Sequence, residues 1–152
     1  MHNKTIKLLS LILIFAIALA GCGNGADIDP AELAKTLATG LSYDDPLSEI
    51  PKEDISLYMD LPENAEASFY KSGGSTSEAV CVVSCKNSED AKQANDALNT
   101  YIEEQKTLFE AYDAQETDRL SKSVLVQKGN TVAMCICADA DAAKKLIDEA
   151  AE

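Results

Sequence analysis

The stretch AVCVVSCKNSEDAKQANDALNTYIEEQKTLFEAY, residues 79–112, joins a strand pattern directly to a long helix pattern. Over residues 79–85 apolar side chains fill both alternating positions, which is typical of a central strand covered on two faces. Asn87 and Ser88 are N-cap residues followed by acids, and apolar residues then recur at steps of three and four. We therefore expect a helix over residues 88–112.

The apolar stripe of this helix has two interpretations. It packs on the protein's own sheet, or it forms a partner-binding face or a coiled coil. The stripe is short and contains alanines and Gln105, which favours packing within the protein.

Two further strand patterns stand downstream of the helix. Residues 124–128 and 131–137 are separated by a Gly-Asn pair, which is typical of a tight β-hairpin. Asp139 or Asp141 then caps a last helix with apolar residues on one side.

Upstream, residues 67–71 and 79–86 indicate a β-hairpin closed by a loop with two glycines. An Asp-Pro start with an acid in the first turn predicts a helix at about residues 30–40. Between them, residues 42–54 are interpreted as a connector and residues 55–59 as a short strand or extended arm.

The predicted order, in which runs of strands are separated by helices, favours an α+β fold. We expect a mostly antiparallel sheet of about five strands with helices packed on one face. The expected domain organisation is a lipoprotein signal peptide over residues 1–21, a lipid-anchored flexible spacer over 22–28, and a single α+β domain over 29–152.

The N-terminus carries the features of an export signal. Two lysines precede the apolar run LLSLILIFAIALA, which is shorter than the roughly 20 residues that span a bilayer. Leu19-Ala20-Gly21-Cys22 matches the lipobox of bacterial lipoproteins, whose resemblance implies cleavage before Cys22 and acylation of its sulfur. The expected location is the outer, extracytoplasmic face of the plasma membrane, with the membrane as partner through the lipid on Cys22.

The charge and the composition of the chain argue against several classes of function. From Cys22 onward, 131 residues carry 26 acidic and 11 basic side chains, a net charge of −15, which repels nucleic acid. The same part contains no histidine, and this argues against Ser-His-Asp and Cys-His catalysis and against histidine-bearing metal sites. We expect no cofactor and no catalytic residue, although a carboxylate pair cannot be singled out among so many acids.

Four cysteines, Cys81, Cys85, Cys135 and Cys137, lie in the expected strands. Three interpretations stay open for them. They are buried small hydrophobic residues, or one of the first pair forms a cross-strand disulfide with one of the second, or all four bind zinc. Cys81 and Cys85 cannot bridge each other, because four strand steps separate them by about 13 Å.

Three weaker motifs have ordinary structural interpretations. Gly73-Gly74 lacks the surrounding residues of a phosphate-binding loop and is expected to form a turn. Asp44-Asp45 and Asp139-Ala140-Asp141 lack the glycine and glutamate of a calcium-binding EF loop, so solvation and helix capping account for them.

Together with the lipobox and the acidic spacer, the segments SFYKSGGSTSEAVCVVSCKN, YIEEQKTLFEAYDAQE and VLVQKGNTVAMCICAD resemble Gram-positive bacterial lipoproteins that bear the domain of unknown function 4358. The resemblance covers about residues 28–150 and rests on the order of several motifs. It implies a small extracytoplasmic α+β domain on a lipid anchor, and it brings no activity, catalytic residue or cofactor. The cysteine-rich strands depart from the aliphatic residues expected in such a family.

The sequence therefore favours a non-enzymatic binding or accessory module at the cell envelope, with an envelope protein or a small ligand as its unidentified partner. Two alternatives stay open. One is an envelope enzyme that uses carboxylates or a reactive thiol, and the other is a receptor for a cation or small ligand.

Overall fold

The computed structural model describes residues 27–152. The elements, in chain order, are α1 (Pro30–Gly40), β1 (Ser48–Ile50), the 3-10 helix η1 (Lys52–Leu57), β2 (Glu66–Lys71), β3 (Ala79–Ser84), α2 (Ser88–Glu110), α3 (Ala114–Ser121), β4 (Val124–Lys128), β5 (Thr131–Ile136) and α4 (Ala140–Ala150). The expected signal peptide and Cys22 lie outside the described residues.

The strands form one five-stranded sheet in the order β1-β2-β3-β5-β4, and every neighbouring pair is antiparallel. The α+β class and the antiparallel sheet are thus confirmed. β3 lies at the centre, as its apolar residues on both faces predicted. The β4–β5 hairpin turns at Gly129, which adopts a φ of 57°, a value that glycine tolerates without strain.

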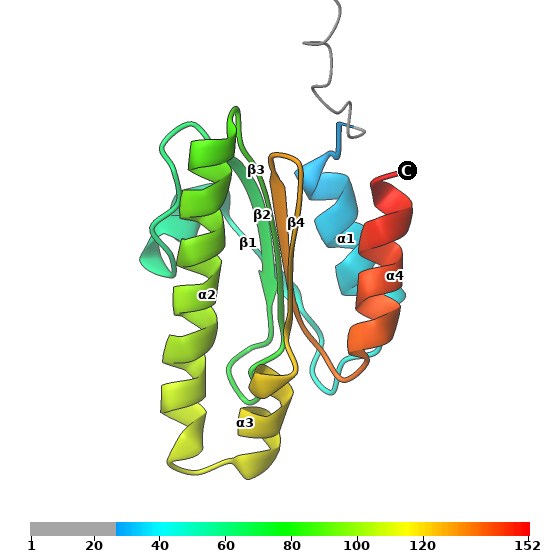
Figure 1. Cartoon of the computed structure of the whole chain (residues 1–152). Helices are drawn as coiled ribbons and strands as arrows, with labels where there is room; N and C mark the ends of the chain where they lie inside the picture. Colours follow the sequence, from blue (N-terminus) through cyan, green and yellow to red (C-terminus); the bar gives the residue numbers. More distant parts are fainter. Residues whose placement is uncertain (1–26) are drawn as a thin grey trace, which may run out of the picture.

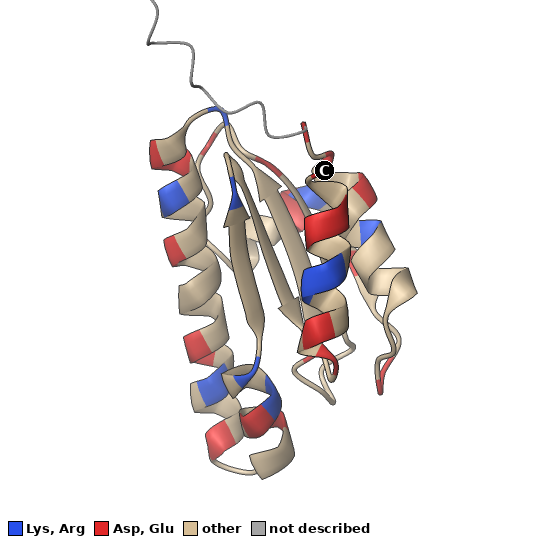
Figure 2. Cartoon of the chain, turned by 45° about the vertical axis from the view of Figure 1, so that its right-hand side comes forward, with Lys and Arg blue, Asp and Glu red and all other residues tan. Residues whose placement is uncertain are grey.

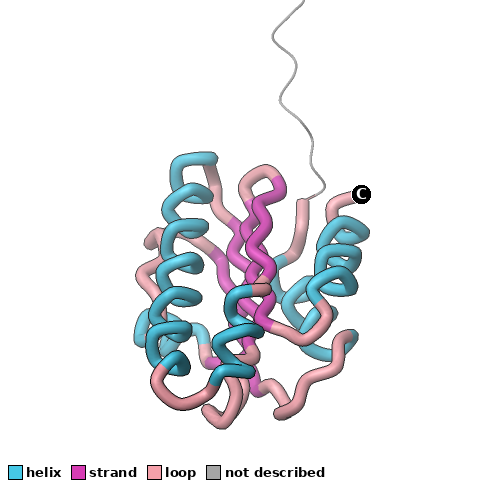
Figure 3. Tube along the Cα trace, turned by 60° about the horizontal axis from the view of Figure 1, so that its bottom comes forward, coloured by secondary structure: helices cyan, strands magenta, loops and turns pink. Residues whose placement is uncertain are grey.

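The helices cover both faces of the sheet, so the expectation of helices on one face was wrong (Figure 1). α2 lies on one face, and α1 and α4 lie side by side on the other; seen from the bottom, the strands run between the two helical layers (Figure 3). The physical reason lies in β3 and β5, whose side chains are almost all buried on both sides. A sheet that is apolar on both faces must be covered by helices on both faces to keep its side chains from water.

Side-chain caps fix where the helices begin. Asp29 accepts hydrogen bonds from the amides of Ala31 and Glu32 at the start of α1, and Asn87 accepts one from Asp90 at the start of α2. Asp139 caps α4 in the same way. Capping of this kind satisfies amides that have no partner inside the helix.

Three short elements differ from the expectation. Residues 55–59 are not a strand: Ile55 belongs to η1, and Ile55 and Met59, four residues apart, are buried on the same side. β1 forms inside the expected connector by pairing with β2. α3 was not expected at all, because its buried positions include Glu116 and Arg119 rather than a run of apolar residues.

Candidate functional site

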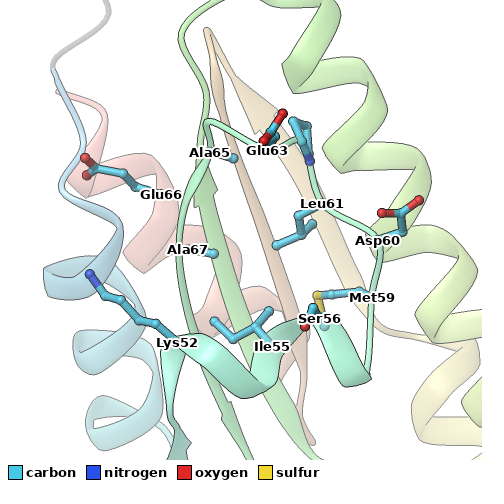
Figure 4. Close-up of a pocket in the computed structure, with 11 residues that line it drawn as sticks. Lys52, Ile55, Ser56, Met59, Asp60, Leu61, Glu63, Ala65, Glu66 and Ala67 are labelled. Atoms are coloured by element: carbon cyan, nitrogen blue, oxygen red, sulfur yellow. The ribbon is translucent and has the colours of Figure 1, made fainter.

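An open groove lies between η1, the segment after it and the start of β2 (Figure 4). We call it the η1 groove; its volume is about 330 Å³. Ile55, Met59 and Leu61 contribute apolar surface to it, and Ala65 and Ala67 line the opposite side without filling it. The small alanine side chains leave the space that the groove occupies.

The charged residues of the η1 groove are mainly acidic. Asp60, Glu63 and Glu66 line it and are exposed, against the single basic residue Lys52. An apolar surface bordered by exposed carboxylates is suited to a ligand that carries both apolar and positively charged groups.

A second hollow, of about 360 Å³, adjoins the η1 groove on the side of α2. Tyr58, Met59 and Asp60 line it from one side, and α2 adds the acids Asp96 and Glu104. Because Met59 and Asp60 line both hollows, the two form one continuous surface around the segment after η1. Acidic positions recur along the length of α2 (Figure 2).

Two side chains next to the groove are exposed although they are large and apolar or aromatic. Leu57, the last residue of η1, is 78% exposed, and Tyr58 is 37% exposed. Single exposed apolar residues are common on protein surfaces, but here they adjoin a groove with an apolar floor. This combination marks the η1 groove as the candidate binding surface.

Aromatic contacts anchor the segment after η1 to the sheet. The ring of Phe69 in β2 packs edge-on against two other rings. Its centroid lies 5.4 Å from that of Tyr58 and 5.6 Å from that of Tyr101 in α2. The Cys81 thiol also lies 3.8 Å from the Met59 sulfur. The floor of the groove therefore rests on the core beneath α2.

A largely buried ionic cluster joins α3 to the β2–β3 loop and to the loop between α1 and β1. Arg119, the only arginine from Cys22 onward, contacts Asp44, Glu116 at 2.6 Å and Glu78 at 3.7 Å. Glu78 and Glu116 are almost completely buried. Burial lowers the pKa of Arg119, but the hydrogen bond to Asp44 and the charges of Glu78 and Glu116 outweigh it and raise the pKa.

The two buried glutamates of this cluster hold three segments together. Glu78 accepts hydrogen bonds from the amides of Asp44 and Asp45 and from the Thr76 hydroxyl, at 3.0 to 3.1 Å. Glu116 accepts from the amide and hydroxyl of Ser77 at 2.7 Å. These contacts join the α1–β1 loop, the β2–β3 loop and α3, which indicates a structural role for the cluster.

The four strand cysteines fall into two pairs on opposite faces of the sheet. Cys81 and Cys85 belong to the cluster under α2, and Cys135 and Cys137 belong to the cluster under α1 and α4. The register explains the separation: Cys81 faces Met134, and Cys135 faces Val80. All four thiols are free and buried, and the structure does not bring a member of one pair against a member of the other.

The weaker motifs occupy ordinary structural positions. Gly73-Gly74 lies in the β2–β3 loop, where Gly74 adopts a φ of 112°. Asp44 pairs with Arg119, and Asp139 caps α4. Within residues 27–152, no group of three or more His, Cys, Asp or Glu side chains is arranged to hold a metal ion.

A model of the family described as "Domain of unknown function (DUF4358)" matches residues 47–137. The chain belongs to this family. The matched part of the DUF4358 domain contains the whole sheet, α2, α3 and the η1 groove, whereas α1 and α4 lie outside it. No curated protein and no solved structure matches the chain.

None of the helices of residues 27–152 is both long and apolar enough to cross a bilayer.

Proposed function

We propose that this DUF4358 protein is a lipid-anchored binding module of the cell envelope, and that its η1 groove takes up a segment of another envelope protein that carries apolar and basic side chains. The observation that carries the proposal is the groove itself: its apolar floor of Ile55, Met59 and Leu61 is bordered by three exposed acids and one lysine. The neighbouring hollow adds Asp96 and Glu104 on the same surface.

The charge of the whole exported chain supports the same choice of partner. A net charge of −15 attracts cationic segments over a distance of about 8 Å at physiological salt. Anionic partners and anionic lipid headgroups are repelled by it. In this proposal the negative charge of the protein selects a basic partner. The apolar floor of the groove and the adjacent Leu57 supply the apolar contact area for binding.

The lipobox provides the membrane anchor in this proposal. Ile28 is already buried against the core, so the spacer that begins at Cys22 is short. Six residues reach at most about 20 Å when fully extended. The domain is held close to the bilayer, and its partner is a segment that lies near the membrane surface.

The anchor is tested by the intact mass of the membrane-extracted protein. We expect a chain that starts at Cys22 and carries acyl groups. A mass that retains residues 1–21 and has no acyl chain would refute the anchor while leaving the groove untested, so the two parts of the proposal fail separately.

Binding in the groove is tested with a fluorescent peptide of alternating lysine and leucine. We expect the triple variant D60N/E63Q/E66Q to bind it about tenfold more weakly, because each exposed ion pair contributes up to about 1 kcal/mol. Fluorescence anisotropy at physiological salt measures the affinity.

The matched control for this titration is E89Q/E110Q/E152Q, which removes three exposed acids outside the groove and changes the net charge equally. It should bind the peptide nearly as well as the wild-type protein. Equal weakening in both triple variants would mean that the peptide responds to net charge alone, and the groove would lose its assignment.

A further inference from the structure

Cys135 and Cys137 form a thiol pair that the proposed function does not use. Cys135 lies in β5 and Cys137 follows directly after its end, so their Cα atoms are separated by about 6.6 Å and their side chains point to the same face. Cys135 is fully buried and Cys137 is 3% exposed. Both lie under α1 and α4, away from the η1 groove.

Polar groups converge on this pair from the surrounding elements. The Tyr43 hydroxyl lies 3.7 Å from the Cys135 sulfur and donates a hydrogen bond of 3.0 Å to the carbonyl oxygen of Leu37. The Cys137 thiol donates to the carbonyl oxygen of Asp139 at 3.4 Å. A phenol, two thiols and a carbonyl thus meet within a cluster that is otherwise apolar, which plain hydrophobic packing does not require.

The two thiols also affect each other electrostatically. Hydrogen bonding to Cys137, together with burial, raises the pKa of Cys135. Hydrogen bonding from Cys135 outweighs burial and lowers the pKa of Cys137. The side chains of Cys135 and Cys137 are therefore close enough to interact.

We propose that Cys135 and Cys137 are a two-thiolate binding site for the cuprous ion, Cu(I). Soft thiolate ligands select Cu(I), a closed-shell ion that is stable with two sulfur ligands. Structural zinc sites take four ligands, and no third His, Cys, Asp or Glu joins this pair in the described residues. Two thiols without further ligands therefore favour Cu(I) over zinc.

The binding of Cu(I) by the two thiols requires no oxidant or reductant. Both S–H bonds break, two S–Cu bonds form, and two protons leave to solvent; copper stays Cu(I), and the two sulfurs become thiolates without any change of oxidation state. The Tyr43 hydroxyl keeps its hydrogen bond to the carbonyl oxygen of Leu37 and lies beside the Cys135 sulfur. Tyr43 belongs to the loop between α1 and β1.

The test is a titration of the full chain with Cu(I) supplied from a chromophoric chelator under reducing conditions. Every protein carries C22S, so that the anchor cysteine adds no thiol. We expect one Cu(I) per chain and an ultraviolet thiolate-to-copper absorption band. Zn(II) in the same assay should not bind. Absence of the band, or equally tight binding of Zn(II), would overturn the proposal without recourse to any variant.

Variants then locate the site. C137S should weaken Cu(I) binding by more than about 100-fold, which exceeds the loss seen when only an outer-sphere partner of a metal ligand is removed. The matched control is C81S. It removes a buried thiol that contacts the Met59 sulfur on the opposite face of the sheet, under α2. Wild-type affinity in C137S, or an equal loss in C81S, would contradict the assignment. Thermal unfolding of each variant confirms that it is folded before titration.

Discussion

Replacement of Arg119 by methionine is expected to lower the free energy of unfolding by about 3–5 kcal/mol, the usual effect of leaving a buried charge without its partner. Glu78 and Glu116 are almost completely buried, and Arg119 is the cation that both of them contact. Methionine fills similar space but compensates neither carboxylate. Urea unfolding followed by circular dichroism measures the loss.

Two further variants separate charge from packing at Arg119. The triple variant R119M/E78Q/E116Q removes the uncompensated charges as well, and we expect it to recover part of the lost stability. The control is K122M at the C-cap of α3. Lys122 pairs with Asp118 at 2.6 Å, but both side chains are more than 60% exposed, so a loss below about 1 kcal/mol is expected. If R119M costs no more than K122M, the cluster does not hold the three segments together.

Replacement of Phe69 by alanine is expected to cost about 3–5 kcal/mol, because it removes a fully buried ring and leaves a cavity. Phe69 contacts both Tyr58 and Tyr101, so its loss also removes the contact that anchors the segment after η1. Domains of this size are stable by about 5–15 kcal/mol, and the change therefore consumes a large share of the total. Denaturant unfolding gives the magnitude.

The milder variant F69L links this packing to the groove. Leucine keeps most of the buried apolar volume, so the fold should persist with a smaller loss than in F69A. The edge-on aromatic contacts disappear, however, and Tyr58 and the groove floor lose their support. We expect F69L to bind the lysine-leucine peptide more weakly than the wild type. Unchanged affinity in folded F69L would show that the aromatic contacts do not shape the groove.

The regular elements were predictable because their buried residues are apolar and periodic. The alternation in β3 and β5 and the three-to-four spacing in α2 are patterns that a sequence displays directly. α3 was missed for the opposite reason: it turns Glu116 and Arg119 inward, and a pattern of hydrophobicity cannot detect a helix with charged residues on its buried side. A single arginine in so acidic a chain was the available clue.

The candidate site was less predictable than the fold. Residues 55–59 were predicted as a short strand or extended arm rather than as part of η1, and the groove forms only when that segment meets β2 and α2. The position of the thiols depends likewise on the register of β3 against β5. Because a shift of one residue would turn Cys135 to the other face, composition and spacing alone left the disulfide open.

The central claim, that the η1 groove binds an apolar, basic segment, is tested most directly by photo-crosslinking the lysine-leucine peptide from defined positions. A photoreactive residue replaces either Leu57, beside the groove, or Leu108 of α2. Both leucines are exposed, but Leu108 lines neither hollow. We predict efficient crosslinking from position 57, its loss in D60N/E63Q/E66Q, and little crosslinking from position 108. Equal yields from the two positions would contradict the account.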